Sequence, residues 1–268
     1  MFLKTLNNNK LKKVYLTIDD SPGTQFTAKV NLLAHHKIPA VFFCIGQLME
    51  RYPDAVIDSI HKGFIIANHS YSHPAFSKVS LEQAKEEIYK TDQIIEAIYQ
   101  TAGVKRPTKW FRFPYGDKGD LKNGKVFSIF PQGSKKRGAN IQKILRELGY
   151  EQPAMDGVTY RYMQKAKLWE DADWAWTFDI MEWAMEMDKP PQGLHNLDKI
   201  FQRLKTKNPR DCRGFLMGEN RWLSSPSDEI LLLHDHEATN DYFITIINYL
   251  LTLPFSFESF DKLTQNKV

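Results

Sequence analysis

In the stretch Val14-Tyr-Leu-Thr-Ile-Asp-Asp-Ser-Pro-Gly23 of this 268-residue chain, a run rich in β-branched and aromatic residues ends abruptly in two carboxylates and a turn. Residues 14–18 are therefore predicted to be a buried strand, with Asp19 and Asp20 just beyond its carboxyl end. Similar runs predict further strands at 40–44, 64–67, 109–113, 174–178 and 230–233.

Segments with helical spacing lie between these runs, as expected for βα units on a parallel sheet. Two connections, at about 117–173 and 184–229, are too long for ordinary βα loops and are predicted to be insertions. We therefore predict a single α/β domain over residues 1–268. Helices are predicted at 26–36, 47–62, 80–102, 140–148, 196–206 and 239–252, with Ser80 as an N-terminal cap and Gly103 as a stop.

The composition excludes several classes of protein. The 36 Lys and Arg residues against 32 Asp and Glu leave a net charge of only +4, spread along the chain, which does not support binding to nucleic acid. No apolar run approaches the roughly 20 residues that cross a bilayer. Because the start has no apolar stretch of signal-peptide length, we expect a cytoplasmic protein if the chain is complete, and an extracytoplasmic one if a leader was removed.

Some polar and aromatic residues have a plain structural interpretation. Cys44 and Cys212 are too few for a disulfide framework or a four-thiolate zinc site, and Cys44 is expected to be buried. The run Lys135–Arg137 either binds an anionic substrate or is a solvated basic loop. The period-two spacing of aromatic residues favours core positions for Trp174 and Trp176, and the same is expected of Trp110. The oligomeric state has no signal in the sequence.

Five of the predicted strands end in a polar or ionisable residue. In a parallel β/α barrel the carboxyl ends of all strands open on one face, so side chains scattered over more than 200 positions are expected to converge there. This pattern predicts an active site. The residues are Asp19 with Asp20, His69, Arg112, Asp179 and His234.

His69 and His73 are four positions apart, and Pro74 disfavours a helix at His73, which places the pair in a tight turn after a strand. Two imidazoles and one carboxylate with an open position suit a catalytic Zn²⁺ that carries water. The same three ligands also suit Fe²⁺, Mn²⁺ or Co²⁺.

Asp19 and Asp20 are adjacent at a strand end, where successive side chains point to opposite sides. One of them is expected to bind the metal while the other accepts a proton from a nearby water. Arg112 needs a carboxylate partner if it is buried, and Asp19 is the natural one. His234 is a candidate general acid, because a modest shift of its pKa makes it a proton donor.

Taken together, five ordered motifs resemble those of the polysaccharide deacetylase family, which is also called the NodB homology domain or carbohydrate esterase family 4. The resemblance covers residues 15–115 well and 174–252 in outline, and both predicted insertions lie outside it. The motifs are Thr17–Pro22, Asn68–Pro74, Arg112–Gly116, Trp176–Trp183 and Leu231–Asp235, and Ala40–Gly46 resembles the family's second strand.

The resemblance implies an irregular (β/α)7 barrel that removes acyl groups, usually acetyl from sugars, with a divalent metal. We expect Zn²⁺ first, with Co²⁺, Mn²⁺, Ni²⁺ or Fe²⁺ as alternatives. The implied roles are Asp19 as catalytic base, Asp20, His69 and His73 as metal ligands, His234 as catalytic acid, Arg112 as the residue that orients the base, Asp179 as the carboxylate that supports His234, the Tyr115 N–H as an oxyanion donor and Trp183 as a groove wall.

Two positions depart from the family pattern. Ser21 stands where the first motif ordinarily has Gly, so the local turn is expected to differ while Pro22 and Gly23 still bend the chain. Glu182 replaces a second Asp in the fourth motif, which leaves open whether Asp179 or Glu182 contacts His234.

The expected function is therefore a metal-dependent hydrolase that removes N-acetyl groups from amino sugars in a peptidoglycan-like or chitin-like glycan. One alternative keeps this chemistry on a small or lipid-linked sugar or a non-sugar amide. An alternative of another class is an inactive carbohydrate-binding protein. The expected partner in each sugar-binding case is an acylated carbohydrate.

Overall fold

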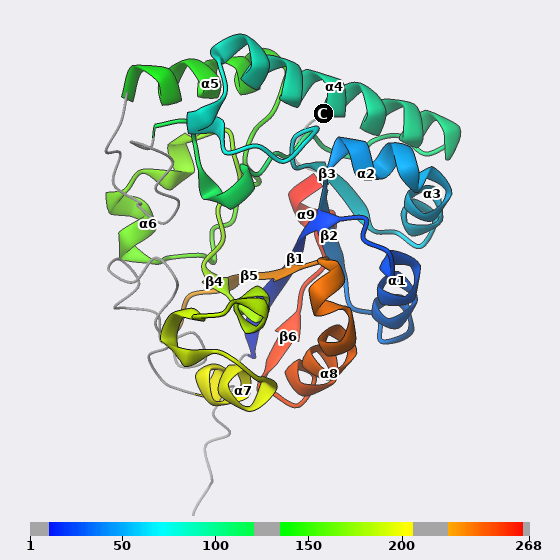
Figure 1. Cartoon of the computed structure of the whole chain (residues 1–268), viewed down its shortest axis with the longest axis vertical. Coiled ribbons are helices and arrows are strands. Elements are labelled where there is room, and N and C mark those ends of the chain that lie inside the picture. Colours follow the sequence, from blue (N-terminus) through cyan, green and yellow to red (C-terminus); the bar gives the residue numbers. More distant parts are fainter. Residues whose placement is uncertain (1–10, 121–134, 206–224, 265–268) are drawn as a thin grey trace, which may run out of the picture.

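A computed structural model describes residues 11–120, 135–205 and 225–264 of the chain. Parallel strands form its centre, and helices surround them on the outside (Figure 1). The strands are β1 (Lys12–Ser21), β2 (Ala40–Cys44), β3 (Ile65–Asn68), β4 (Phe178–Asp179), β5 (Glu229–His234) and β6 (Phe255–Phe257).

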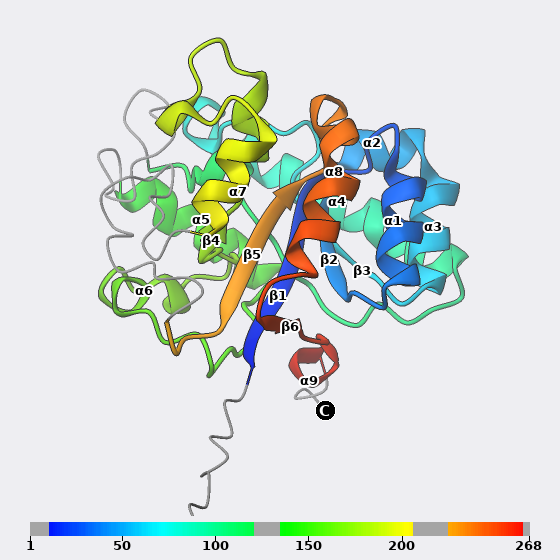
Figure 2. The same cartoon turned by 90° about the horizontal axis from the view of Figure 1, so that it is seen from below.

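Helices connect the strands along the chain. Those in the described ranges are α1 (Phe26–His35), α2 (Gly46–Arg51), α3 (Pro53–His61), α4 (Leu81–Thr101), α5 (Lys135–Glu147), α6 (Arg161–Lys165), α7 (Leu197–Lys205), α8 (Asn240–Leu250) and α9 (Asp261–Thr264). In Figure 2, α1 and α3 lie on one side of the strands, α7 lies on the other, and α8 lies in front of the strands. None of the described helices is both long enough and apolar enough to span a bilayer.

Strand β1 is the centre of the sheet, whose order is β3-β2-β1-β5-β4. It pairs in parallel with β2 from Leu16 and with β5 from Val14 to Asp19, and its first residues also pair with β6. The register places Asp19 opposite His234 of β5. Two residues far apart in sequence are therefore brought side by side at the carboxyl end of the sheet.

Irregular segments complete the barrel between β3 and β4. Asn68 and Phe111 form one parallel bridge, and the Trp174 N–H donates to the Phe111 carbonyl at 2.7 Å. The strand predicted at 109–113 is therefore wrong as an element, because Pro107 and Pro114 bracket the segment and it forms only this bridge. The predicted strand 174–178 is reduced to β4. The α/β class and the parallel barrel are confirmed.

Other boundaries also differ from the predictions. The predicted helix 47–62 is two helices, because Pro53 begins α3 and holds Tyr52 outside the helical region. Strand β6 was not predicted. Ser80 caps α4 through a capping box with Gln83, and Gly103 follows this helix with a φ of 66°, both as predicted.

The core has two layers because side chains alternate along the strands. Phe42, Ile66 and Leu231 pack outward against the helices. Val41, Ile65 and Leu232 pack inside the barrel with Trp110, Trp174 and Trp176, whose predicted core positions are confirmed by exposures of 2%, 0% and 7%. Cys44 is also buried, as predicted, whereas Cys212 lies outside the described residues.

A buried ion pair joins β5 to α1 beneath the open end of the barrel. The Lys29 ammonium contacts Asp235 Oδ1 at 2.5 Å, with both side chains almost wholly buried. Asp235 Oδ2 accepts a hydrogen bond from the Gly23 N–H at 2.7 Å, and a Cβ at Gly23 would lie 2.5 Å from the Asp235 carbonyl oxygen. The close approach explains the glycine, and Asp235 thereby ties the turn after β1 to the end of β5.

Replacing Lys29 with Met is expected to destabilise the fold by about 3 kcal/mol, because it leaves the Asp235 carboxylate buried without its cation. Chemical denaturation of Lys29→Met, Asp235→Asn and the double variant measures this. We expect the double variant to lose less stability than the sum of the single variants. Additive losses below about 1 kcal/mol each would show that the pair does not hold the two elements together.

Candidate active site

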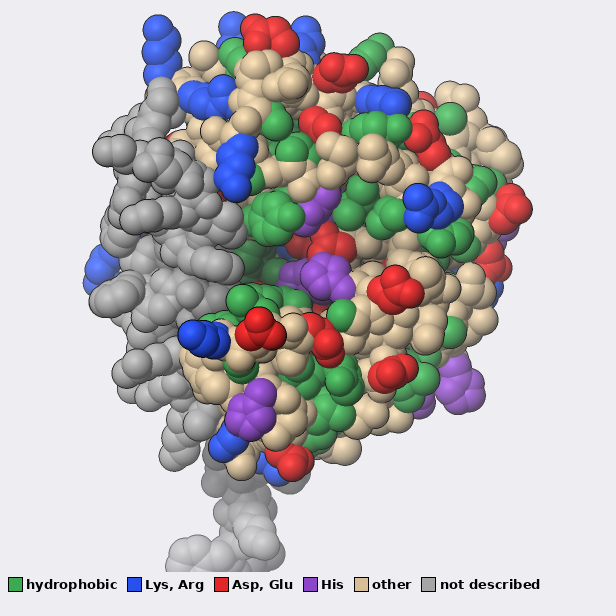
Figure 3. Space-filling model, viewed as in Figure 1, with side chains coloured by type: hydrophobic (Ala, Val, Ile, Leu, Met, Phe, Trp, Pro, Cys, Tyr) green, Lys and Arg blue, Asp and Glu red, His purple; other side chains and the backbone are tan. Residues whose placement is uncertain are grey.

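A cleft of about 750 Å³ opens at the carboxyl ends of β1 and β5. Histidine and acidic side chains gather in the hollow at the middle of this face (Figure 3). Among the residues that line the cleft are eight of those selected from the sequence. They are Asp19, Asp20, His69, His73, Tyr115, Asp179, Trp183 and His234.

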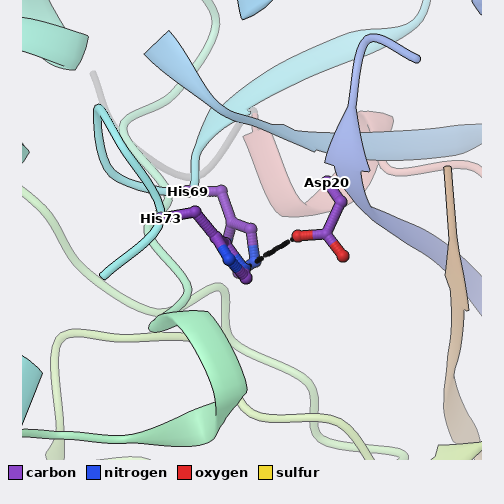
Figure 4. A group of neighbouring side chains, drawn as sticks. All are labelled: Asp20, His69 and His73. Atoms are coloured by element: carbon purple, nitrogen blue, oxygen red, sulfur yellow. Dashed lines mark ion pairs between the residues drawn. The ribbon is translucent and has the colours of Figure 1, made fainter. Parts of the chain in front are cut away.

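Asp20, His69 and His73 form one group whose ligand atoms all lie within 4.8 Å of one another. Asp20 Oδ1 is 3.3 Å from His69 Nε2 and 2.9 Å from His73 Nε2. The two imidazoles come from the turn after β3 and point toward the carboxylate at the end of β1 (Figure 4). The structure thus brings together the three predicted metal ligands.

Hydrogen bonds of the backbone orient this group. His69 Nδ1 lies 2.8 Å from the Arg112 carbonyl oxygen, which can only accept, so Nδ1 carries a proton and Nε2 is the nitrogen that faces Asp20. The backbone at Asp20, Ser70 and His73 has positive φ angles of 65°, 69° and 59°. Asn68 supports the turn by accepting a hydrogen bond from the Ser70 N–H at 2.8 Å.

The residues present fit a divalent cation. Asp20 Oδ1 is buried and has no hydrogen-bond partner, although two imidazole nitrogens face it. Burial opposes ionisation of Asp20, but its interactions with His236, His69 and His73 outweigh burial and hold the pKa of this carboxyl well below its usual range. An ionised carboxylate and two imidazoles are the donor set of catalytic zinc sites.

Asp19 lies beside this group and is paired with Arg112. The guanidinium donates from Nη1 to Asp19 Oδ1 at 2.8 Å and to Thr17 Oγ1 at 2.9 Å, and from Nε to the Trp174 carbonyl at 3.0 Å. The other oxygen of Asp19, Oδ2, is 3.7 Å from His69 Nε2. Arg112 therefore fixes a second carboxylate next to the metal-binding group, as the sequence predicted.

His234 is the last residue of β5, the strand next to β1, and contacts Glu182. Its Nδ1 is 3.2 Å from Glu182 Oε1, which also accepts a hydrogen bond from the His234 N–H. Burial favours the neutral imidazole, but the nearby charge of Glu182, its hydrogen bond and the charge of Asp179 prevail and raise the pKa of His234 to about 10. The ring is therefore protonated at neutral pH.

Two carboxylates, Asp179 and Glu182, lie near His234. Glu182 makes the direct contact with the His234 ring. Asp179 instead accepts hydrogen bonds from the Met181 N–H at 2.7 Å and from Trp183 Nε1 at 3.2 Å. Its carboxylate nevertheless lies within 4.8 Å of the Glu182 carboxylate and the His234 ring. Asp179 thus acts on His234 through its charge and places the indole of Trp183 in the cleft wall.

The sequence of the chain matches the model of one known protein family. The family model described as "Polysaccharide deacetylase" matches residues 7–153, which is more than half of the chain. The chain belongs to the polysaccharide deacetylase family. The match contains Asp19, Asp20, His69, His73 and the segment of Arg112, whereas His234 and its partners lie beyond it.

Curated polysaccharide deacetylases match a similar region. A peptidoglycan-N-acetylglucosamine deacetylase of Bacillus cereus is 36% identical over 106 residues, which are 39% of this chain and 37% of that protein. A chitooligosaccharide deacetylase of Rhizobium leguminosarum is 34% identical over 93 residues, 34% of this chain and 43% of that protein. The chain thus spans less than half the length of these relatives.

Solved structures share the fold over nearly the whole chain. The peptidoglycan deacetylase PdaC of Bacillus subtilis has a TM-score of 0.56 at 21% identity, covering 95% of this chain and 90% of that one. A CE4 family pseudoenzyme of Bacillus anthracis has a TM-score of 0.57 at 19% identity, covering 96% and 67%. Because one of these two proteins is a pseudoenzyme, a shared fold does not by itself indicate activity.

The remaining family positions lie where the motifs suggested. The ring of Tyr115 is half-exposed beside His73, with 4.6 Å between the ring centres, and Tyr115 has a φ of 57°. Ser21, which replaces the family's glycine, is the last residue of β1 and pairs with Cys44. Ser21 thus ends the strand, and Gly23, two residues later, packs against Asp235.

The basic run at 135–137 serves the fold in part. Arg137 Nη2 donates to the Phe76 carbonyl at 2.8 Å and also to that of Val79, so this guanidinium braces the segment before α4. The side chain of Lys135 lies outside the described residues. Lys136 is exposed on α5.

Sequence reasoning missed three residues of the site. Asp235 anchors the turn after β1, and His236 contacts Asp20 Oδ2. Glu87 of α4 accepts hydrogen bonds from the N–H groups of Tyr71 and Ser72 at 2.8 and 2.7 Å and from Ser72 Oγ at 2.6 Å. Only Asp235 and His236 could have been found from the sequence, because they directly follow the candidate acid His234.

Replacing Glu87 with Ala is expected to weaken zinc binding about tenfold, because the turn that carries His69 and His73 loses three hydrogen bonds. Competition with a chromophoric chelator measures the dissociation constant. Glu86→Ala, at an exposed position of the same helix, is the matched control. Equal dissociation constants for the two variants would show that Glu87 does not shape the metal-binding turn.

Replacing Glu182 with Gln is expected to lower the pKa of His234 from about 10 toward the ordinary value near 6.5, because the imidazolium loses its nearest negative charge. Titration of the imidazole signals by NMR measures this in the metal-free protein. Asp179→Asn is the comparison and should lower the pKa less, because Asp179 contributes less than Glu182. A larger shift in Asp179→Asn would reverse these roles.

Proposed function

We propose that this protein is a divalent-metal-dependent deacetylase that hydrolyses the N-acetyl groups of amino sugars in a glycan such as peptidoglycan or a chitooligosaccharide. One observation carries the proposal. One aspartate and two histidines, which together could hold a cation, lie in a single cleft with a carboxylate held by Arg112 and with His234, which contacts Glu182.

The roles follow from where the groups lie. When bound by Asp20, His69 and His73, the cation lowers the pKa of a water molecule and polarises the acetyl carbonyl. Asp19, which Arg112 holds in place, takes a proton from the attacking water. The oxygen nucleophile then forms a bond to the acetyl carbon, and the carbonyl oxygen takes up the negative charge.

Collapse of the tetrahedral species breaks the carbon–nitrogen bond. An amide anion is a very poor leaving group, so the nitrogen needs a proton as it departs. His234 lies opposite Asp19 in the register of the neighbouring strand, lines the same cleft and is protonated at neutral pH. It supplies this proton, while the Tyr115 N–H stabilises the oxyanion. The products are acetate and a free amine on the sugar.

The cleft walls fit a sugar ring. Trp183 contributes a partly buried indole that Asp179 holds near His234, and the half-exposed ring of Tyr115 lies beside His73. Aromatic faces stack on the apolar faces of sugars. The named activities of the relatives on peptidoglycan and chitooligosaccharides support the same class of substrate.

The alternative of an inactive carbohydrate-binding protein has less support. A pseudoenzyme is among the chains that share this fold. In the present chain, however, the ligand group, the carboxylate held by Arg112 and the protonated His234 are all in place. A binding protein has no need to retain both a base and an acid in the same cleft.

Asp19→Asn and His73→Ala are expected to abolish turnover in different ways. Asp19→Asn should bind one metal per chain and lose at least about 10³-fold in kcat, because the base is gone but the ligands remain. His73→Ala should lose the metal on dialysis, because one ligand is gone. Metal content per chain and the rate of acetate release are measured on both variants. Equal loss of metal in the two variants would contradict this division of roles.

A further inference from the structure

His236 occupies a place in the cleft that the motifs do not describe. It follows the fifth motif by one residue, lines the same cleft as the metal-binding group and has a side chain that is 39% exposed. Its Nε2 forms a hydrogen bond with Asp20 Oδ2. An ionised carboxylate oxygen only accepts, so His236 donates the proton.

The two oxygens of Asp20 therefore have different partners. Oδ1 faces His69 and His73 and, although buried, has no hydrogen bond of its own. Oδ2 is taken by His236. Of the two compact groups of possible metal ligands among the described residues, the one at the end of β1 consists of Asp20, His69 and His73, and His236 is outside both. The contact with His236 thus leaves Oδ1 as the oxygen of Asp20 that could bind a cation together with His69 and His73.

The position of His236 is set by the chain around it. The N–H of its neighbour Asp235 donates to the Asp19 carbonyl at 2.8 Å, and the Asp235 side chain holds Gly23 and Lys29. On the other side, Thr239 Oγ1 donates to the His236 carbonyl at 3.0 Å, at the start of η7 (Glu237–Thr239). The loop after β5 is thereby fastened to the end of β1, with His236 next to Asp20.

We propose that His236 is a positioning residue for the metal site, whose Nε2–H holds Oδ2 of Asp20 and aims Oδ1 at the cation shared with His69 and His73. This inference rests on the proposed function, because it assumes that the group binds a metal. Partners of metal ligands orient the ligand and limit its rotation, and their loss typically costs 10- to 100-fold in metal affinity.

The experiment compares His236→Ala, His236→Gln and the wild type. Alanine removes the donor, whereas glutamine keeps an N–H that can reach Asp20. His195→Ala is the matched control, because His195 is exposed and lies outside the residues that line the cleft. The dissociation constant for Zn²⁺ is measured by chelator competition, and the visible spectrum of the Co²⁺-loaded protein reports the set of ligands.

We expect His236→Ala to bind Zn²⁺ 10- to 100-fold more weakly than the wild type, His236→Gln to recover most of the affinity, and His195→Ala to match the wild type. The Co²⁺ spectrum should keep the band position and intensity of the wild type in both His236 variants. This combination distinguishes a positioning residue from a ligand.

Two results would overturn the inference while leaving the proposed function intact. One is an affinity for Zn²⁺ in His236→Ala equal to that of the wild type. The other is a Co²⁺ spectrum that shows the loss of a nitrogen ligand in both His236 variants, which would make His236 a ligand itself. A wild-type protein that binds neither Zn²⁺ nor Co²⁺ would overturn the proposed function and the inference together.

Discussion

The buried carboxylate of Asp20 is the constraint on which the rest of the site depends. It lies at the end of the central strand, where imidazoles from two separate loops face it. An ionised carboxylate in such a place costs several kcal/mol unless cations or donors compensate it. In the absence of a metal, His69, His73 and His236 compensate the charge of Asp20. A bound metal would instead be held by Asp20 together with His69 and His73. The parallel barrel makes the arrangement possible, because its strand ends bring these distant loops together.

Much of the site followed from the sequence because barrel geometry does the assembly. Once Asp19, Asp20, His69 and His234 were assigned to strand ends, their convergence needed no knowledge of side-chain contacts. The pairing of Arg112 with Asp19 followed from the cost of burying an unpaired guanidinium, and the structure shows that pair at 2.8 Å. The alternating core followed in the same way from the period of the strands, with Trp110 and Trp174 inside.

What the sequence could not supply depends on backbone that departs from regular strands and helices. Met181 has a φ of 64°, and this kink allows Glu182 to reach His234 while Asp179 takes the Met181 N–H. Glu87 accepts a hydrogen bond from the backbone N–H of Ser72, 15 residues away in the sequence. Every residue other than proline has such an N–H group, so the pattern of side chains does not indicate this contact. The segment at 109–113 has the composition of a strand, but tertiary contacts give it one bridge and use it to close the barrel.

In the proposed function, deacetylation requires a cation held by Asp20, His69 and His73. This is tested by measuring the release of acetate from N-acetylglucosamine oligomers and peptidoglycan by the chelated protein, with Zn²⁺, Co²⁺ or nothing restored. We expect no release without metal and a return of activity on at least one substrate when one equivalent per chain is added. Release that is undiminished by chelation, or a protein that binds one metal tightly and releases acetate from neither substrate, would contradict the proposed function.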